Sequence, residues 1–517
     1  MRHSRTVLVL PLAALLALAG CTAPEQDPAA VSGRVPAGLE RFYGQQVSWG
    51  GCADFATTPL AGQVFAAPGL QCARVRVPLD YSRPDGRTAS VALLRRPAGD
   101  PAARIGSLLV NPGGPGASGM VSAASLAGAV ADTELGRRFD LVGFDPRGVG
   151  ASEPKIECRT TAEQDAERLD TDLDTSPAGV AQTEAEERAY AQLCARRVGE
   201  EVLANVGSRD VARDMDVLRA VLGDEKLTYL GFSYGTRIGT EYAEQFPRNV
   251  RAMVLDGAMD PDEPLVESLV NQAGGFQGSF DAFVDRCLPR PGCWTDGPVP
   301  ATEREFQELI APLAQRPLPV GNRRLSYSDA VTATIQGLYS DQLWPLLSQG
   351  LAALERGDGS TLLALADMYY QRSPAGYSGS EDAFTAIRCV DDQPVTDRAE
   401  VREADRRYRA AAPFLDDGNQ PSAARDACAF WPVPPTDEPG LQYVEGLPPV
   451  LVVSTTGDPA TPYEAGEELA RALGGRLLTF EGNQHTVALQ GVACIDNAVT
   501  AYLVDGTLPP EGTRCAP

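Results

Sequence analysis

Ser233 is the side chain of this sequence whose surroundings best suit a nucleophile. It lies in Gly-Phe-Ser-Tyr-Gly (231–235), after the short β-prone segment 227–230 and before a helical pattern. A Gly-x-Ser-x-Gly sequence between a strand and a helix predicts a sharp turn that exposes the serine hydroxyl, and glycine tolerates the unusual backbone angles of such a turn. The motif occurs once in the chain, but an ordinary tight turn would also account for it.

A base must remove the proton of a serine hydroxyl before it can attack a carbonyl, and histidine is the usual base. The chain contains two histidines, and His3 lies in an N-terminal segment that we expect to be removed. The other, His485, follows the expected strand 476–480 in a loop. Asp458, in a Gly-Asp-Pro turn after another expected strand, is the candidate acid that orients the imidazole. The predicted catalytic triad is therefore Ser233, Asp458 and His485.

Acyl transfer also requires N–H groups that bind the negatively charged oxygen of the tetrahedral intermediate. We expect the main-chain N–H of Tyr234, directly after the nucleophile, and that of Gly114. Gly114 belongs to Asn-Pro-Gly-Gly-Pro-Gly (111–116), which follows the buried strand 107–110. A phosphate-binding loop is disfavoured because no Gly-Lys-Ser/Thr follows, which leaves a plain turn as the alternative. The segment 145–152 is interpreted as a structural brace for the nucleophile turn.

Strands and helices alternate over much of the chain, a pattern typical of a mostly parallel sheet with helices on both faces. Strands are expected at 72–81, 90–95, 107–110, 139–144, 227–230, 250–255, 450–454 and 476–480. The first two form a hairpin at the edge of the sheet. Ser208 could N-cap a helix whose apolar positions are 211, 215, 218 and 222. Asp458 follows the end of a strand, where open α/β sheets place their sites.

The alternation stops between about residues 260 and 440, where helical patterns, prolines and cysteines occur without a clear buried strand. A long segment between two parts of one sheet predicts an inserted, mainly helical cap. The expected fold class is therefore α/β, an α/β-hydrolase-like sheet with a large cap. The predicted units are a signal peptide (1–20), a lipidated tether (21–40), the first part of the core (41–259), the cap (260–440) and the second part of the core (441–517).

The N-terminal segment has the form of an export signal. Arg2, His3 and Arg5 precede an apolar stretch, residues 7–20, that is too short to span a bilayer. The stretch ends in Leu-Ala-Gly-Cys, which resembles the bacterial lipobox, with Cys21 as the lipidated residue. An ordinary secretory signal with a coincidental cysteine is the alternative. We expect an exported lipoprotein on the outer face of the cell membrane, or a form shed or secreted from it, because several acyl chains anchor a protein stably.

Charge and metal-ligand content restrict the partners of this chain. The formal net charge of −24 argues against nucleic acid and against anionic membrane surfaces, so membrane contact is expected only through the lipid anchor. The sequence has no Cys-x-x-Cys, and His485 is the only histidine after the signal peptide, which argues against a zinc site. We therefore expect neither a metal nor a cofactor.

The cysteine count fits an exported protein with disulfides. Eleven cysteines are present, and ten remain when Cys21 is set aside. An even number in an exported chain indicates a set of disulfides. Connectivity does not follow from sequence, but pairing of nearest neighbours would close local loops. This hypothesis gives the pairs Cys52–Cys72, Cys158–Cys194, Cys287–Cys293, Cys389–Cys428 and Cys494–Cys515.

Five motifs together resemble those of one enzyme family. They are Asn-Pro-Gly-Gly-Pro-Gly (111–116), Gly-Phe-Asp-Pro-Arg-Gly-Val-Gly-Ala-Ser (143–152), Gly-Phe-Ser-Tyr-Gly-Thr (231–236), Gly-Asp-Pro-Ala-Thr-Pro (457–462) and His485. Over nearly all of its mature length the chain resembles the secreted tripeptidyl aminopeptidases of actinobacteria, among the prolyl-aminopeptidase-like α/β-hydrolases. Residues 445–517 resemble the separate C-terminal domain of that branch. Gln484 and Thr486, rather than glycines, flank the histidine, which is a departure from the pattern.

The resemblance implies a serine exopeptidase that releases short peptides from free N-termini through an acyl-enzyme, with peptides as its partners. Such an enzyme needs an anion for the ammonium group of the substrate, and the cap should supply it. The candidates are the acids at 381–382 and 391–392, of which Asp391 is preferred. An esterase or lipase on the same fold is one alternative. A surface binding protein without catalysis is another, although an intact Ser233, Asp458 and His485 argue against it.

Overall fold

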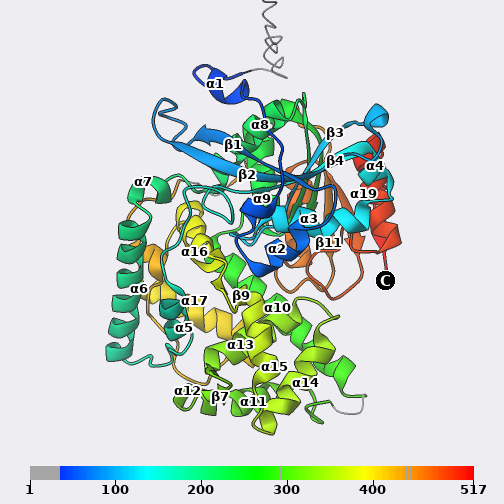
Figure 1. Ribbon diagram of the computed structural model, residues 1–517. Helices are drawn as coiled ribbons and strands as arrows, with labels where there is room; N and C mark the ends of the chain where they lie inside the picture. Colours follow the sequence, from blue (N-terminus) through cyan, green and yellow to red (C-terminus); the bar gives the residue numbers. More distant parts are fainter. Residues whose placement is uncertain (1–34, 290–292, 437–439, 442–443) are drawn as a thin grey trace, which may run out of the picture.

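The computed structural model describes residues 35–289, 293–436, 440–441 and 444–517 (Figure 1). The predicted signal peptide, Cys21 and most of the predicted tether lie outside these ranges.

Nine strands form one sheet in the order β1-β2-β4-β3-β5-β6-β11-β12-β13. All of them run parallel except β2, which pairs antiparallel with both of its neighbours. The strands are β1 Gln71–Pro78, β2 Thr88–Arg96, β3 Gly106–Asn111, β4 Phe139–Asp145, β5 Leu227–Phe232, β6 Val250–Asp256, β11 Leu451–Thr455, β12 Arg476–Phe480 and β13 Arg514–Cys515. The mostly parallel α/β sheet predicted from the sequence is confirmed, with the β1–β2 hairpin at its edge.

Helices cover both faces of the sheet. Every residue of β3, β4 and β5 is buried, as the near-continuous apolar runs of covered parallel strands require. Successive side chains enter opposite clusters, so Leu108 and Leu109 lie in different halves of the core. The helices on one face are α1 Glu40–Tyr43, α8 Ser208–Val221, α9 Tyr234–Gln245 and α18 Tyr463–Ala472. Those on the other face are α2 Pro59–Phe65, α3 Gly119–Val130, α4 Glu134–Arg138 and α19 Ala493–Asp505.

The chain between β6 and β11 is mainly helical and lies below the sheet in Figure 1. Its helices are α10 Leu265–Cys287, α11 Val299–Ile310, α12 Pro312–Gln315, α13 Tyr327–Leu338, α14 Trp344–Glu355, α15 Ser360–Tyr369, α16 Ser380–Asp391 and α17 Arg398–Ala411. Two short hairpins, β7 Leu318–Val320 with β8 Arg323–Leu325 and β9 Arg372–Ser373 with β10 Gly376–Tyr377, stay outside the main sheet. Most of these helices share a third apolar cluster, but α16 packs into the core of the sheet domain.

Three helices that precede the nucleophile turn lie away from the sheet, beside α16 and α17 (Figure 1). They are α5 Thr161–Glu167, α6 Pro177–Arg197 and α7 Glu200–Leu203. Glu184 of α6 is ion-paired with Arg398 at 2.5 Å and with Arg425 at 2.8 Å. The ion pairs of α6 thus join it to the inserted helices, whereas the buried residues of α7 belong to the core of the sheet domain.

The structure contains five disulfides in the nearest-neighbour order predicted from the sequence. Cys52–Cys72 and Cys494–Cys515 cross-link segments of the sheet domain. Cys158–Cys194 joins the loop after β4 to α6. Cys389–Cys428 fixes the C-terminal half of α16. Disulfides of this number are typical of proteins that fold in an oxidising compartment.

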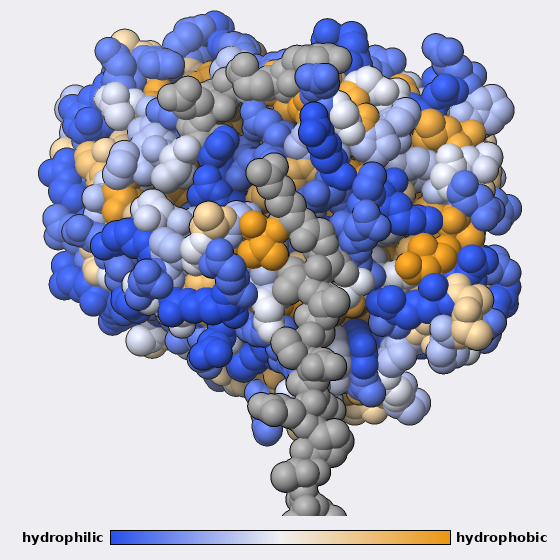
Figure 2. All heavy atoms as spheres, turned by 90° about the horizontal axis from the view of Figure 1, so that it is seen from above, coloured by the Kyte–Doolittle hydropathy of each residue, from blue (hydrophilic) through white to orange (hydrophobic). Residues whose placement is uncertain are grey.

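The face of the molecule shown in Figure 2 is mainly hydrophilic, with small and separate hydrophobic areas. No helix within the described ranges has the length and apolar character needed to cross a membrane.

Candidate active site

Ser233 occupies a strained turn between β5 and α9. Its backbone angles are φ 53° and ψ −126°, a combination that residues other than glycine rarely adopt. The flanking glycines allow the close approach of backbone to backbone. A Cβ on Gly231 would lie 2.5 Å from the carbonyl oxygen of Gly235, and one on Gly235 would lie 2.7 Å from that of Asn111. The turn therefore depends on glycine at both positions, and it presents Ser233 at the start of a helix.

Asp458 and His485 are in direct contact. The Nδ1 atom of His485 lies 2.9 Å from each carboxylate oxygen of Asp458, whose side chain is almost fully buried. The N–H groups of Ala460 and Thr461 also donate to this carboxylate at 2.9 Å. The hydroxyl of Thr461 lies 3.1 Å from Oδ2 of Asp458 and 3.3 Å from Nδ1 of His485. This set of donors fixes the carboxylate and leaves Nε2 of the imidazole directed away from it.

The environment favours the charged imidazolium at His485. Burial lowers the pKa of this imidazole, but the charge and hydrogen bond of Asp458 outweigh burial and hold the pKa above its ordinary value. The buried carboxylate of Asp256 acts in the same direction. Stabilisation of an imidazolium is what a general base requires once it has accepted a proton.

Asp256 connects the nucleophile turn to the histidine loop, and the sequence analysis assigned it no role. It ends β6, and its carbonyl oxygen accepts the N–H of Ser233 at 2.9 Å. Its Oδ2 accepts the N–H groups of Val487 and Ala488 at 2.8 and 2.7 Å, whereas Oδ1 is buried without a partner in the described part of the chain. Burial raises the pKa of Asp256 to about 6. An aspartate at the carboxyl end of a parallel strand was the available signal.

The residue after Asp256 places the imidazole next to the nucleophile turn. A Cβ on Gly257, which has φ +66°, would lie only 3.1 Å from Cε1 of His485. Because the neighbouring carbonyl of Asp256 binds the N–H of Ser233, the turn and the imidazole border the same short segment. The structure thus brings Ser233, Asp458 and His485, predicted from three distant motifs, to one edge of the sheet.

The glycine loop that carries one of the two amides predicted for an oxyanion hole touches the turn that carries the other. A Cβ on Gly113 would lie 2.6 Å from the main-chain nitrogen of Tyr234, so the glycine loop touches the nucleophile turn. The N–H of Gly113 donates to the side chain of Asn111 at 2.9 Å. Within the described residues, neither the N–H of Gly114 nor that of Tyr234 donates to another protein group. Both amides are thus free to bind a substrate oxygen.

The segment 145–152 is structural, as predicted, but it braces a different element. Asp145 accepts the hydroxyl of Ser118 at 2.6 Å and the N–H of Met120 at 3.1 Å, both at the start of α3. Arg147 forms a buried ion pair with Asp214 of α8 at 2.6 Å. The segment therefore fixes the helix that follows the glycine loop and one of the helices beside the nucleophile helix.

Aromatic side chains of the inserted helices cover the histidine. The ring of Tyr339 lies 5.5 Å from the imidazole of His485, edge to face, and its carbonyl oxygen accepts the N–H of His485 at 2.8 Å. The ring of Tyr369 lies 6.5 Å from that of Tyr339, and Tyr370 follows at 5.6 Å from Tyr369. No feature of the sequence marked these tyrosines, because they come from a region without a recognised motif.

Glu381, at the start of α16, acts electrostatically on these tyrosines. The pKa of Tyr339 and that of Tyr370 are raised to about 12, mainly by burial and in part by the charge of Glu381. Glu381 itself is partly exposed, and its carboxylate has no hydrogen-bond or ion-pair partner among the described residues. Burial raises its pKa to about 7.

The other acids considered for a substrate ammonium group are engaged elsewhere. Asp382 is fully buried and accepts the N–H groups of Cys158 and Arg159. Asp391, the preferred candidate, is 2% exposed and binds the N–H of Ser208 and the hydroxyl of Tyr234. Our preference for Asp391 is therefore wrong, because its carboxylate is already saturated by internal donors.

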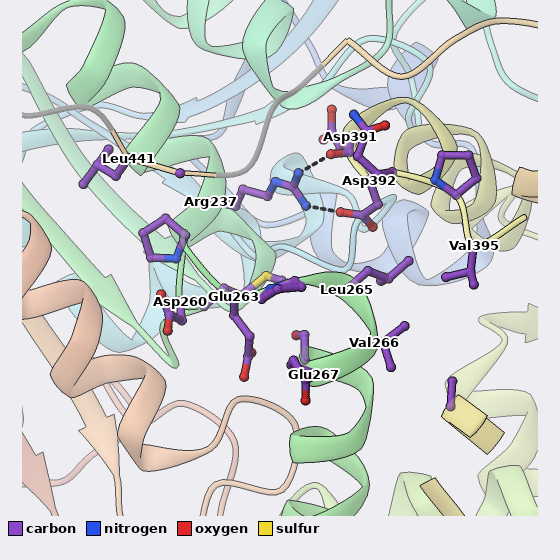
Figure 3. A pocket seen from close by; sticks show the side chains of 18 of the residues that line it. Arg237, Asp260, Glu263, Leu265, Val266, Glu267, Asp391, Asp392, Val395 and Leu441 are labelled. Atoms are coloured by element: carbon purple, nitrogen blue, oxygen red, sulfur yellow. Dashed lines mark hydrogen bonds and ion pairs between the residues drawn. The ribbon is translucent and has the colours of Figure 1, made fainter. Parts of the chain in front are cut away.

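Asp391 and Asp392 instead border a cavity of about 420 Å³ between α9, α10 and α17 (Figure 3). Arg237 reaches the main-chain carbonyl of Asp391 and, at 2.6 Å, the carboxylate of Asp392. The described residues that line this cavity include neither Ser233 nor His485. The cavity is thus separate from the triad. Within the described ranges, no cluster of histidine, cysteine and acidic side chains could hold a metal ion.

Sequence comparisons agree with this geometry. Serine protease Hip1 of Mycobacterium tuberculosis is 48% identical over 487 residues, 92% of each chain. Carboxylesterase B of the same species is also 48% identical, over 512 residues that cover 98% of this chain and 96% of the relative. Tripeptidyl aminopeptidase of Streptomyces lividans is 32% identical over 466 residues, 87% of this chain and 84% of the relative.

The match to a family covers most of the described structure. Residues 106–492 match the family described as the alpha/beta hydrolase fold, a span that runs from β3 to the loop before α19 and includes the nucleophile turn, the inserted helices and the histidine loop. This chain therefore belongs to the α/β-hydrolase family.

Proposed function

We propose that this protein is a serine exopeptidase that cleaves peptide bonds near a free N-terminus and releases short peptides. Ser233 is the nucleophile, His485 the base and Asp458 the acid that orients it. The observation that carries the proposal is the contact of Asp458 with Nδ1 of His485 beside a strained Ser233 turn. The relatives named serine protease and tripeptidyl aminopeptidase support a peptidase.

The chemistry follows from these positions. His485 takes the proton of Ser233 as Oγ bonds to the scissile carbonyl carbon, and the carbonyl oxygen becomes an oxyanion held by the N–H groups of Gly114 and Tyr234. The tetrahedral intermediate collapses, the C–N bond breaks, and His485 gives its proton to the leaving amine. Water then attacks the acyl-enzyme with the same base, which releases the peptide acid and restores Ser233. Asp458 stays ionised throughout and stabilises the imidazolium.

Glu381 supports the exopeptidase mode. A free N-terminus carries an ammonium group, and its recognition requires an anion at a fixed distance from the nucleophile. The carboxylate of Glu381 has no partner among the described residues, and its charge raises the pKa of Tyr339, Tyr369 and Tyr370, whose aromatic faces also attract cations. Tyr339 in turn contacts His485. We assign the ammonium group of the substrate to Glu381.

A matrix of substrates tests this assignment. The acyl part is a tripeptide with a free amine, its N-acetylated form or its desamino form, each joined to an amide or an ester leaving group. With each leaving group, wild-type protein should cleave the free-amine substrate fastest, and Ser233→Ala should retain only a small residual rate. Glu381→Gln should raise KM for free-amine substrates about 10- to 100-fold, the value of one hydrogen bond to a charged group. The N-acetylated and desamino substrates should change little.

A matched variant separates the Glu381 contact from the general field of an acidic protein. Glu157 is an exposed acid close to the same end of α16, and its ion pair with Lys155 is long, at 3.7 Å. Glu157→Gln removes the same charge and should leave every KM unchanged. Equal effects of Glu381→Gln on free and acetylated substrates would refute the ammonium assignment.

Ester hydrolysis is the second candidate function, because one relative of equal identity is named carboxylesterase. The same triad serves both reactions. If simple acyl esters are cleaved and no free-amine peptide amide is, the protein is an esterase and the peptidase proposal fails. Failure of a fluorophosphonate probe to label Ser233 would favour the remaining alternative, a binding protein without catalysis.

We propose in addition that Cys21 carries the lipid anchor. The support is the Leu-Ala-Gly-Cys sequence after the apolar segment, together with disulfides that suggest an extracellular protein. Expression of the full chain in a bacterial host with labelled palmitate should label the wild type and not Cys21→Ser. A labelled Cys21→Ser protein, or an unlabelled wild type, would refute the anchor.

A further inference from the structure

Helix α16 contacts both halves of the proposed oxyanion hole. Its first turn lies against the glycine loop: a Cβ on Gly116, which has φ +91°, would lie 2.6 Å from the carbonyl oxygen of Ser380 and 3.3 Å from Cβ of Ala383. Its last residue, Asp391, accepts the hydroxyl of Tyr234. The helix therefore spans the distance between the loop that carries Gly114 and the residue that carries the second amide.

The contact at the C-terminal end is buried and specific. Tyr234 is 5% exposed and Asp391 is 2% exposed, so the hydroxyl and the carboxylate meet away from solvent. Arg237, one turn later in α9, donates to the main-chain carbonyl of Asp391 and to Asp392 (Figure 3). The C-terminal end of α16 thus binds two side chains near the start of α9, those of Tyr234 and Arg237.

The carboxylate of Asp391 is itself fixed by a third helix. Both of its oxygens accept the N–H of Ser208, at 2.9 and 3.0 Å, at the start of α8. A Cβ on Gly207 would lie 2.4 Å from Oδ1 of Asp391, so the close approach depends on glycine there. Our expectation that Ser208 caps α8 is wrong, because Asp391 supplies the acceptor and the Ser208 hydroxyl is buried without a partner among the described residues.

The rest of α16 is anchored along its length. Asp382 accepts the N–H groups of Cys158 and Arg159, and Cys158 forms a disulfide with Cys194. Cys389, near the other end, is bonded to Cys428. The apolar residues of α16 join the core of the sheet domain rather than the cluster of the inserted helices. A helix held in this way resists displacement of either end.

We propose that α16 is a brace that sets the spacing of the two oxyanion-binding amides, and that Asp391 is a positioning residue that acts through the hydroxyl of Tyr234. The hydrogen bond to Asp391 fixes the side chain of Tyr234, which is the first residue of α9. A fixed side chain restricts the backbone conformation of its own residue, and so it restricts the position of the Tyr234 main-chain N–H. An oxyanion hole needs donors at fixed positions relative to an oxygen that is charged only in the transition state. The inference rests on the proposed serine hydrolase function.

Tyr234→Phe is the most direct test, since it removes one hydroxyl and no charge. The readouts are steady-state kinetics with a free-amine tripeptide amide and inhibition by a peptidyl trifluoromethyl ketone, whose adduct with Ser233 places an oxyanion in the hole. We expect kcat to fall about tenfold and the inhibition constant to rise by the same factor, with KM unchanged, as for an interaction made only in the transition state. Asp391→Asn should act in the same direction.

Tyr242→Phe is the matched control. Tyr242 lies two turns further along α9, and its hydroxyl donates to the buried carboxylate of Asp216 at 2.9 Å. The variant removes the same group from the same helix, so it should lower thermal stability while both kcat and the inhibition constant stay within about twofold of the wild type. The double variant Tyr234→Phe/Asp391→Asn should be no slower than the slower single variant, because the two residues act through one contact.

The results separate this inference from the proposed function. Wild-type hydrolysis and labelling of Ser233 establish the enzyme first. If a folded Tyr234→Phe protein then keeps both wild-type kcat and wild-type inhibition, the brace is refuted and the enzyme stands. A lower melting temperature with unchanged inhibition would assign the contact to stability alone and would equally refute the inference.

Discussion

The carbonyl oxygen of Asp256 accepts the main-chain N–H of Ser233 at 2.9 Å. The carboxylate of the same aspartate binds the two N–H groups that follow Thr486. One buried residue at the end of β6 therefore ties the nucleophile turn to the loop that carries His485. This residue, together with the contact between Asp458 and His485, holds the two segments in place relative to each other.

Removal of the Asp256 carboxylate should loosen the histidine loop. Asp256→Ala leaves two buried N–H groups, those of Val487 and Ala488, without acceptors, and each such loss costs about 1–3 kcal/mol. We expect a lower free energy of unfolding in urea and a fall in kcat. Asp256→Asn keeps an oxygen for both N–H groups and should retain most of the stability. Equal destabilisation by both variants would contradict this account.

The rate should depend on the protonation of His485. If His485 is the base, as proposed, it is active when neutral. Asp458 holds its pKa above about 6.5, so kcat/KM should rise with pH through a midpoint above that value. The effect on stability has the opposite sign. A raised pKa adds stability that is fully present below about 6.5 and is lost as the pH rises through the folded-state pKa. Unfolding curves and pH–rate profiles measured together check both.

Asp256 should influence that pH dependence from a distance. Its buried charge raises the pKa of His485, so Asp256→Asn should move the acidic limb of the kcat/KM profile to lower pH. The wild-type limb should be broad, because burial raises the pKa of Asp256 to about 6, close to that of His485, and the two groups are coupled. An unchanged limb in Asp256→Asn would show that its charge does not reach the imidazole.

The strands and the motif residues of the candidate site could be predicted from the sequence, whereas the packing of the helices around them could not. Strand positions could be predicted because buried parallel strands such as β3 and β5 are continuous apolar runs between turn signals. Ser233, Asp458 and His485 were accessible because each follows a strand in a distinctive turn. The position of α6 could not be predicted, since the sequence of an amphipathic helix does not reveal which partner the helix packs against. The ion pairs of α6 with Arg398 and Arg425 join residues more than two hundred positions apart.

Residues that act through tertiary contacts were missed for the same reason. Asp391 carried the correct chemistry, an acid near the site, but its partners Ser208 and Tyr234 come from two other helices. Our proposal of Glu381 for the role expected of Asp391 required the burial and pairing of each carboxylate, which the sequence does not give. Tyr339 has no local signal at all, because its ring meets His485 only in the folded chain.

The acid of the triad offers a graded test. Asp458→Asn keeps the shape of the side chain but can hold the wrong imidazole tautomer, and the analogous change in serine proteases lowers kcat about 10⁴-fold. We expect a similar loss here, measured with the free-amine tripeptide amide. Ser233→Ala and Ser233→Ala/Asp458→Asn should have the same residual rate, because the residues act as a unit. A slower double variant would mean that Asp458 has a role independent of the nucleophile.

The disulfides should differ in their effect on stability. Cys389–Cys428 closes a separation of 39 residues and Cys287–Cys293 one of 6. Loop-closure entropy predicts that loss of the first costs about 4 kcal/mol and loss of the second about 2 kcal/mol. Paired Cys→Ser variants, unfolded in guanidinium chloride, measure both.

Activity should separate the same two variants. Cys389 lies on α16, the helix between the glycine loop and Tyr234, so its release should also lower kcat at temperatures where the protein stays folded. Release of Cys287–Cys293, at the far end of α10, should leave kcat unchanged. If both variants lose stability and kcat in parallel, the loss of kcat reflects general unfolding. That result would contradict a separate effect of α16 on the rate.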